Sequence, residues 1–162
     1  KRVLNCTKQY QQNLLHKKLL IIFRERQDNS IRFIEVIFHE RNYQHLTGLE
    51  LTNTEGKILQ HQSKNFYRKC IENKLGLNDV DKVMGGVNFC LGLSRENDVF
   101  IPSSALLEDI KKLTSSPSQV LAIFEKDIDS ELYSTVKHVA KGLNLHHLIL
   151  PPEINSKILL PK

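Results

Sequence analysis

The sequence predicts an α+β fold in which a multistranded, largely antiparallel sheet is interleaved with packing helices. Two observations predict it. Short segments rich in β-branched and aromatic residues alternate with segments whose apolar residues recur at helical spacing, and turn-forming residues join neighbouring β-type segments closely enough for hairpins. The chain has 162 residues, of which 40% are hydrophobic and 25% charged. This length suits one well-filled core, so we expect a single domain spanning residues 1–162.

The first predicted element is a β-hairpin. Residues 18–24 (KLLIIFR) and residues 31–39 are rich in β-favouring side chains, and the segment RQDNS between them supplies turn chemistry. The second strand carries apolar residues on both faces: Ile31, Phe33 and Ile37 on one, and Ile34, Val36 and Phe38 on the other. Because a strand that is apolar on both faces is typical of the middle of a sheet, we expect helices to pack against it.

The middle of the chain predicts two helical pieces and a second hairpin. Residues 63–75 (SKNFYRKCIENKL) have apolar residues at helical spacing between an N-capping serine and a terminating glycine, and residues 77–84 are predicted to continue as a short helix. Residues 87–93 and the segment VFI are predicted to pair as strands across the turn SREND. Ser103 or Ser104 is then predicted to cap a helix that ends at Leu113.

The last third predicts two strands around a helix. Residues 119–125 (QVLAIFE) favour a strand, and residues 145–150 (LHHLIL) favour another before two prolines. Between them, residues 130–143 are predicted to be helical, because the apolar residues Leu132, Val136, Val139 and Leu143 recur at helical spacing.

Charge and hydropathy indicate where the protein acts and what kind of partner it binds. The formal charge is +5 and the pI about 9.1, with much of the basic charge in the first 70 residues, which is compatible with an anionic partner such as nucleic acid. No apolar run approaches the roughly 20 residues that a membrane-spanning helix needs, and no signal peptide opens the chain. We therefore expect a cytoplasmic protein with no membrane partner. The chain begins at Lys1 rather than at a methionine, as a piece of a longer protein would.

Cysteine and histidine spacing disfavours a metal site. The three cysteines, Cys6, Cys70 and Cys90, form no CxxC pair, and their odd number disfavours a complete disulfide framework. We expect them to be reduced, with Cys70 and Cys90 in the core. His146 and His147 are adjacent, a spacing that points the two rings apart on a strand, and no cysteine or acidic residue stands at a familiar zinc spacing from them.

Several reaction classes lose support because their motifs are absent. The sequence contains no GxSxG, GxxxxGK[ST], GxGxxG or HExxH; in HERNYQH the second histidine follows six residues after the first. What remains is chemistry that needs only imidazole, guanidinium or ammonium, and hydroxyl groups. Metal-independent RNA cleavage is such a chemistry, because the ribose 2′-hydroxyl is the nucleophile and the protein need only move protons and neutralise the phosphate. No cofactor is expected.

Three segments carry a resemblance to a known family. NYQHLTGLEL, followed by SKNFYRKCIENKLGLNDV and later by FIPSSALLEDI, resembles the phage-associated branch of the barnase, EndoU, colicin and RelE-like (BECR) nuclease superfamily, with HLTG as the most specific element. The similarity extends roughly from Ile21 to Ile110. The resemblance implies a compact sheet-plus-helices fold and metal-free ribonuclease activity on RNA. It also implies use as a toxin or effector of a phage or mobile element, restrained by an antitoxin or immunity protein.

The resemblance makes His45 the first candidate for general acid or base, since an imidazole with a pKa of about 6.5 can act in either role at neutral pH. Thr47 could orient a phosphate through its hydroxyl. Arg41 and Lys64 could hold the scissile phosphate. The hydroxyl of Tyr67 could reach the same phosphate, or its ring could stack on a base. Further substrate-binding candidates are His39, Arg68 and Lys69.

Each candidate also has a structural interpretation. His45 could bond a backbone carbonyl and hold a turn, Thr47 could cap a helix, and Tyr67 could be a core aromatic. Arg41 and Lys64 could be solvated surface charges, and no acidic residue is placed by spacing to orient His45. The alternative function is therefore a noncatalytic RNA- or protein-binding module of a mobile-element protein. Replacing His45 would abolish turnover but spare binding in an enzyme, and would change little in such a module.

Overall fold

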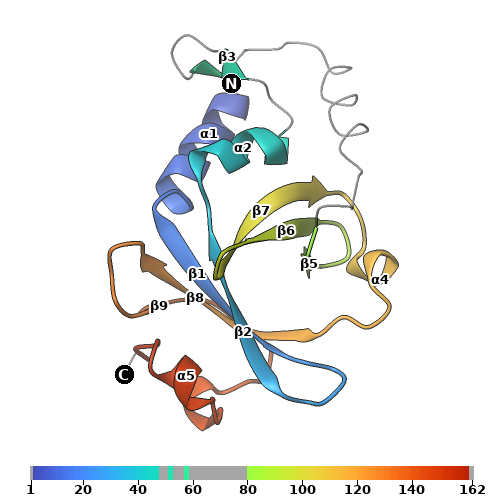
Figure 1. The fold of residues 1–162 in the computed structure, drawn as a ribbon, viewed down its shortest axis with the longest axis vertical. Helices are drawn as coiled ribbons and strands as arrows, with labels where there is room; N and C mark the ends of the chain where they lie inside the picture. Colours follow the sequence, from blue (N-terminus) through green and yellow to red (C-terminus); the bar gives the residue numbers. More distant parts are fainter. Residues whose placement is uncertain (1, 48–50, 53–56, 59–79, 161–162) are drawn as a thin grey trace.

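A seven-stranded mixed sheet forms the centre of the protein in the computed structural model, which describes residues 2–47, 51–52, 57–58 and 80–160 (Figure 1). Its strand order is β5-β6-β7-β2-β1-β8-β9, and neighbouring strands are antiparallel except for β2 and β7, which are parallel. The strands are β1 (Lys17–Arg24), β2 (Ile31–Ile37), β5 (Lys82–Gly85), β6 (Cys90–Glu96), β7 (Val99–Leu106), β8 (Gln119–Asp127) and β9 (Thr135–Val139). The predicted α+β class and largely antiparallel sheet are confirmed.

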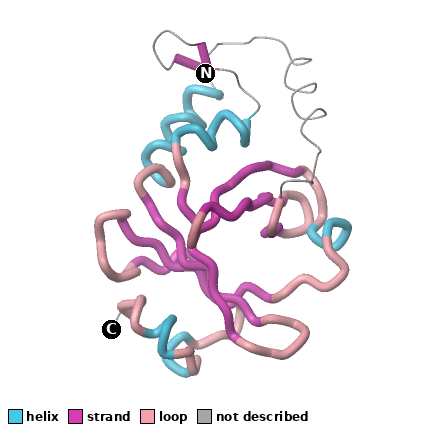
Figure 2. Tube along the Cα trace, viewed as in Figure 1, coloured by secondary structure: helices cyan, strands magenta, loops and turns pink. Residues whose placement is uncertain are grey.

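Short helices lie around the sheet (Figure 2). The helices are α1 (Arg2–Asn13), α2 (Glu40–Thr47), α4 (Ile110–Leu113), α5 (Pro152–Asn155) and a 3₁₀ helix, η2 (Leu145–His147). A separate two-stranded sheet pairs β3 (Leu51–Thr52) with β4 (Lys57–Ile58). In the described part of the chain, no helix is both long and apolar enough to cross a membrane.

The predicted first hairpin is confirmed, and its two strands occupy the middle of the sheet. β1 and β2 pair in register from Lys18 opposite Ile37 to Arg24 opposite Ile31. In the turn, Asp28 Oδ1 accepts hydrogen bonds from the Ser30 N–H at 2.9 Å and from the Ser30 hydroxyl at 2.5 Å. A short polar side chain that bonds backbone two residues on is the turn chemistry that the sequence predicted.

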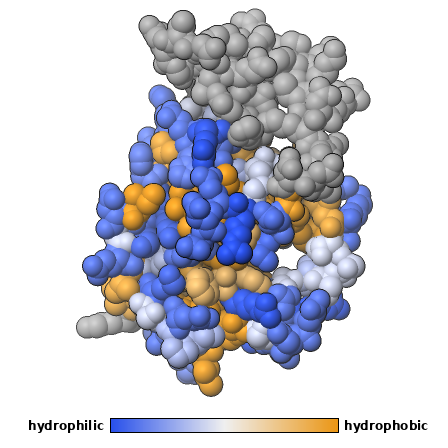
Figure 3. All heavy atoms as spheres, in the orientation of Figure 1, coloured by the Kyte–Doolittle hydropathy of each residue, from blue (hydrophilic) through white to orange (hydrophobic). Residues whose placement is uncertain are grey.

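The alternation of β1 separates two core clusters. Ile21 belongs to a cluster with Tyr10, Val36, Phe38, Tyr43, Leu91 and Leu93, to which α1 and α2 contribute side chains. Leu20 and Ile22 belong to a second cluster, whose other buried members are Leu121, Ala122, Phe124, Tyr133 and Ile154, the last from α5. Since successive strand residues point to opposite faces, the two clusters lie on the two faces of the central strands, as expected for β2. The outer face drawn in Figure 3 is mainly hydrophilic.

Two predictions for the middle of the chain are wrong. Residues 82–85 form strand β5 and not a helix, because they pair with β6 from Lys82 opposite Leu93 to Gly85 opposite Cys90. β7 continues through Ser103 and Ser104, so neither serine caps a helix; α4 begins only at Ile110, where Asp109 accepts from the Lys111 N–H at 2.9 Å. The predicted β6–β7 hairpin is confirmed. The predicted helix over 63–75 lies outside the described residues.

The last third also departs from prediction. β8 is confirmed, but the predicted helix over 130–143 contains strand β9, in which Val136 pairs with Phe124 of β8. The predicted strand over 145–150 begins with η2, whose cap is the Asn144 side chain accepting from the His146 N–H at 3.0 Å. His138 is exposed as expected, on a strand rather than on a helix.

Candidate functional site

Helix α2 carries the first group of candidate residues. β2 ends at Ile37, so His39 stands at the start of the helix and not within the strand that the sequence predicted. The Asn42 side chain accepts from the His39 N–H at 2.7 Å, and the Asn42 N–H donates to the His39 carbonyl at 3.0 Å. This reciprocal bonding satisfies groups that a helix start otherwise leaves unpaired. Glu40 in the first turn has the charge that the helix dipole favours there.

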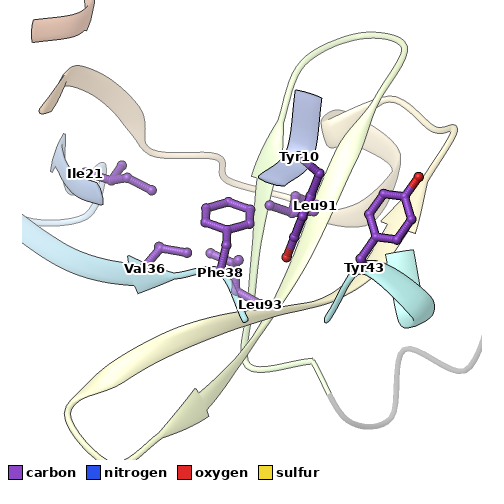
Figure 4. Packing of buried hydrophobic residues seen from close by; sticks show 7 residues of the cluster. All are labelled: Tyr10, Ile21, Val36, Phe38, Tyr43, Leu91 and Leu93. Atoms are coloured by element: carbon purple, nitrogen blue, oxygen red, sulfur yellow. The ribbon is translucent and has the colours of Figure 1, made fainter. Parts of the chain in front are cut away.

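Tyr10 of α1 fixes this helix start from the other side. Its hydroxyl donates to the His39 carbonyl at 2.8 Å. Its ring centroid lies 5.0 Å from that of Tyr43 and 6.1 Å from that of Phe38, within the first cluster (Figure 4). Burial raises the pKa of Tyr10 to about 12, so at neutral pH its hydroxyl is protonated and remains a donor. Thr7 donates to the Tyr43 hydroxyl at 3.0 Å, a second bond between α1 and α2.

Arg41 points its guanidinium to the end of β6. Its Nη2 lies 2.8 Å from Glu96 Oε1 and 2.6 Å from Oε2, so one nitrogen bridges both carboxylate oxygens. The two side chains are 58% and 42% exposed, which makes this a solvent-accessible ion pair whose contribution to stability is about 0.2–1 kcal/mol. Nε–H and Nη1–H₂ donate to no other residue of the described chain. The pair therefore holds the guanidinium in place and leaves donors for an anion.

The structure describes some of the remaining candidate residues and not others. His45 and Thr47 lie in the second half of α2, and His45 follows Arg41 by four residues, so the two positions share one face of the helix. His39 is half-buried at the helix start. Lys64, Tyr67, Arg68 and Lys69 lie outside the described residues. The structure thus collects positions 39, 41, 45 and 47 on one short helix and its cap.

Sequence reasoning missed two residues of this region. Glu96 was assigned to a hairpin turn, and its pairing with Arg41 joins residues 55 apart in the chain, for which no local signal exists. Asn42 could have been found, because an amide three residues after a helix start is a capping pattern. The sequence showed no acidic residue placed to orient His45, and in the structure Glu96 supplies a carboxylate beside Arg41. Among the described residues, no three His, Cys, Asp or Glu side chains are grouped as a metal ion would require.

One comparison with known families gave a match. The family model PBECR4, described as phage-Barnase-EndoU-ColicinE5/D-RelE like nuclease4, matches residues 2–86, which is more than half of the chain. The match starts before the expected Ile21 and ends before the segment FIPSSALLEDI, while the HLTG segment lies inside it. It includes α1, the first hairpin, α2 and β5. No match was found among curated proteins or among solved structures.

Proposed function

The chain belongs to the phage-Barnase-EndoU-ColicinE5/D-RelE like nuclease family, and on that premise we propose that it is a metal-independent endoribonuclease. The observation that carries the proposal is the arrangement on α2. An arginine held by a carboxylate stands one helical turn before the position of a histidine, within the matched residues. A cation and an imidazole at neighbouring positions are the two groups that cleavage of an RNA phosphodiester most needs.

The proposed reaction is an internal transphosphorylation. The ribose 2′-oxygen attacks the adjacent phosphorus, the bond from phosphorus to the 5′-oxygen breaks, and the products carry a 2′,3′-cyclic phosphate and a 5′-hydroxyl. One proton leaves the 2′-hydroxyl and one is delivered to the 5′-oxygen. We assign one of these transfers to His45, because neutral imidazole accepts a proton and imidazolium donates one near neutral pH.

Arg41 is assigned to the scissile phosphate. Charge builds up on the phosphate oxygens during attack, and a guanidinium fixed before the reaction stabilises it without reorganising. Glu96 acts as a positioning residue, since it bonds only Nη2 of the guanidinium and leaves the other edge for phosphate. Further phosphate or base contacts are assigned to Thr47, His39, Lys64, Tyr67, Arg68 and Lys69. The net charge of +5 favours RNA as the partner.

The same proposal includes the biological setting that the family name suggests. An RNA-cleaving protein related to phage nucleases would act as a toxin or effector, and its producer would need an antitoxin or immunity protein. Growth arrest on expression that His45→Ala relieves is the expected sign of that role.

The test is cleavage of total bacterial RNA by the whole chain in EDTA, with the product ends analysed for 2′,3′-cyclic phosphate. His45→Ala is expected to lower the rate by about 10²–10⁴-fold, and Arg41→Ala by about 10²–10³-fold. Two matched controls are available. Arg32 forms an equally exposed ion pair with Asp28 in the β1–β2 turn, and His138 is exposed on β9. Arg32→Ala and His138→Ala should leave the rate within about twofold of wild type.

Three outcomes would overturn the proposal. One is cleavage that stops in EDTA and returns with a divalent metal. Another is cleavage that persists in both His45→Ala and Arg41→Ala. The third is a folded wild-type protein that binds RNA without forming products, which would establish the binding-module alternative in its place.

A further inference from the structure

Strand β9 is the last strand of the sheet, and its outer edge faces away from β8. Figure 1 shows β9 beyond β8, on the side of the sheet where the C-terminus lies. Within the described residues, the backbone of Thr135–Val139 bonds to no segment other than β8. Because alternate residues of an edge strand direct their N–H and C=O groups away from the sheet, this edge presents donors and acceptors to an additional strand.

The chain just before β9 already accepts an extended segment on the same side. The Tyr133 N–H donates to the Lys157 carbonyl at 2.8 Å, and the Leu159 N–H donates to the Tyr133 carbonyl at 2.8 Å. These two bonds form an isolated parallel bridge between Tyr133 and Ile158. Among the described residues the bridge goes no further along β9. A strand from another molecule can therefore pair with Thr135–Val139, over about 17 Å.

Lysine side chains follow this edge. Lys137 lies in the middle of β9, and Lys141 lies two residues after its end. Lys137 pairs with Glu125 at 3.3 Å, but Glu125 is only 8% exposed, so it is the ammonium group that a partner meets. Lys141 is exposed and pairs with no carboxylate of the described chain. Between residues 132 and 152 the sequence contains no Asp or Glu, so the edge favours a partner with negative charge.

The other end of the edge is apolar. Leu132 and Leu159 are 39% and 56% exposed, and they flank the bridge at Tyr133. Tyr133 is buried, and neighbours along an extended chain point to opposite faces, so Leu132 points away from the core. A partner segment can therefore place an apolar residue against Leu132 and Leu159 while its acidic residues lie near Lys137 and Lys141.

These features favour a protein segment over RNA or a second copy of the chain. RNA could contact the lysines, but it has no peptide groups with which to continue the hydrogen-bond ladder of the sheet. Pairing of two β9 strands would bring the lysines of both copies together, and lysine on an edge strand is a common means of preventing such self-association. An acidic polypeptide can use the backbone, the lysines and the exposed leucines at once.

We propose that the outer edge of β9 binds an extended, acidic segment of a partner protein, which adds one strand to the seven-stranded sheet. The segment runs antiparallel to β9, because antiparallel pairing is the more stable per residue. Its acidic residues contact Lys137 and Lys141, and its apolar end contacts Leu132 and Leu159. This partner site does not depend on RNA cleavage at α2.

The experiment is fluorescence anisotropy of a labelled peptide, Glu-Val-Glu-Val-Glu-Val-Leu, titrated with the whole chain. Wild type is expected to bind it with a dissociation constant below about 1 mM. Replacing every glutamate of the peptide by glutamine should weaken binding by about threefold or more, because the contacts with both lysines lose their charge. Two further analogues carry N-methyl groups, one on its glutamates and one on its valines. One of them should lose binding, since it blocks the N–H groups that face β9.

A variant of the protein tests the same surface from the other side. Lys141→Glu should weaken binding of the peptide by about threefold or more. Lys111→Glu is the matched control, because Lys111 is equally exposed on α4, which packs against β5 at the opposite end of the strand order. It should bind as wild type does. Hydrogen exchange of the Thr135–Val139 amides should slow when the peptide is bound.

The peptide analogues keep the inference testable if Lys141→Glu does not fold. No saturable binding to folded wild type up to 1 mM, equal binding of the two N-methylated analogues, or equal binding of the glutamine peptide would each overturn the inference. Tighter binding of a non-cleavable 2′-O-methyl oligouridylate, lost in Lys141→Glu, would assign the edge to RNA instead. A wild-type dimer that the peptide dissociates would assign it to a second copy.

Discussion

Replacing Tyr133 by phenylalanine tests how the half-buried carboxylate of Glu35 is held on the second face of the sheet. Tyr133 is 1% exposed, and its hydroxyl donates to Glu35 Oε1 at 2.7 Å. Burial, and then the hydrogen bond to Glu35, raise the pKa of Tyr133, so the hydroxyl stays protonated. The Lys18 and Lys157 ammonium groups lie 3.3 and 3.6 Å from the same carboxylate. The substitution removes one oxygen and leaves the ring, its packing and both ion pairs in place.

The magnitude follows from the charge of the acceptor. A hydrogen bond to an ionised group contributes about 1.5–3 kcal/mol, against about 0.5–1.5 kcal/mol for a neutral pair. Since both lysines remain beside Glu35, we expect Tyr133→Phe to lower the free energy of unfolding by about 2 kcal/mol at pH 7. For a chain of this length, that corresponds to a fall of roughly 4–8 °C in the melting temperature. Tyr10→Phe is the matched control, because its hydroxyl donates to a neutral carbonyl, that of His39, and the expected loss is about 1 kcal/mol.

The pH dependence separates the two variants. Burial alone would raise the pKa of Glu35, but the Tyr133 hydroxyl and the charges of Lys18 and Lys157 outweigh it and hold the pKa below its ordinary value of 4.5. A lowered carboxylate pKa contributes stability above pH 4.5, and that contribution is lost as the pH falls through the folded-state pKa. The difference between wild type and Tyr133→Phe should therefore shrink below pH 4.5, while the loss in Tyr10→Phe should stay constant.

Urea unfolding followed by far-UV circular dichroism is the suitable assay, because the chain has no tryptophan and both variants delete a tyrosine. Equal losses in the two variants, or a Tyr133→Phe loss that does not change between pH 7 and pH 3.5, would refute the reasoning. Either result would mean that the charge of Glu35 does not strengthen this hydrogen bond.

Two further predictions concern β5, β6 and the turn that joins them. Gly85→Ala should lower stability by about 1–3 kcal/mol, because a Cβ there would lie 2.4 Å from a backbone oxygen of the β5–β6 turn and 2.6 Å from the Cα of Cys90. A Cβ added at Gly86 would meet no atom of the described chain within 4 Å, so Gly86→Ala should change stability by less than about 0.5 kcal/mol. Equal urea midpoints for Gly85→Ala and Gly86→Ala would contradict this difference. In a Cys70→Ser background, exposed Cys6 should react with Ellman's reagent in the native protein, whereas Cys90 should react only on unfolding, because burial raises the pKa of its thiol. Two rapidly titrating thiols in the folded chain would contradict the buried position of Cys90.

The parts of the fold that the sequence predicts correctly are those fixed by local chemistry. The β1–β2 turn contains Asn29 in the left-handed region, with φ 61°, and the β6–β7 turn contains Asn97 with φ 56°. Asparagine tolerates this conformation, so both turns can be recognised without knowing the rest of the chain. The flanking β-branched runs then pair because the turns bring them together. The burial of Cys90, also predicted, follows from its place in an apolar strand.

The parts that failed depend on contacts distant in the sequence. In residues 130–143, the apolar positions fit a helix, but Val136 and Val139 can also pair with Phe124 and Ala122 of β8, which has an open edge on that side. Pairing with β8 favours the strand over the helix, because β-branched residues lose little side-chain conformational freedom in a strand and gain contacts with the neighbouring strand. β5 forms for the same reason against β6. The helix predicted to start at Ser103 or Ser104 fails because β7 extends along the whole of β6.

The candidate site likewise has residues that the local sequence predicts and one that only a contact distant in the sequence provides. His39, Arg41, His45 and Thr47 were predicted from one short segment; α2 carries Arg41, His45 and Thr47, and His39 directly precedes its first residue. The carboxylate that holds Arg41 could not be predicted, because Glu96 arrives through the pairing of β6 with β7 and of β7 with β2. Expectations for Lys64, Tyr67, Arg68 and Lys69 remain predictions.

The position of Glu96 in β6 also limits which fragments of the chain can be used to test the candidate site. The family match ends at residue 86, but within the sheet β5 pairs only with β6, and β2 lies between β1 and β7. Strands β5, β2 and β1 from before residue 86 are therefore interleaved with strands from after it, and the first core cluster needs Leu91 and Leu93 as well as Ile21 and Val36. A fragment ending at residue 86 would lack the partner of Arg41 and expose much of that cluster to water. Loss of activity in such a fragment would report unfolding, so the proposed contribution of Arg41 to catalysis can be measured only in a chain that retains β6 and β7.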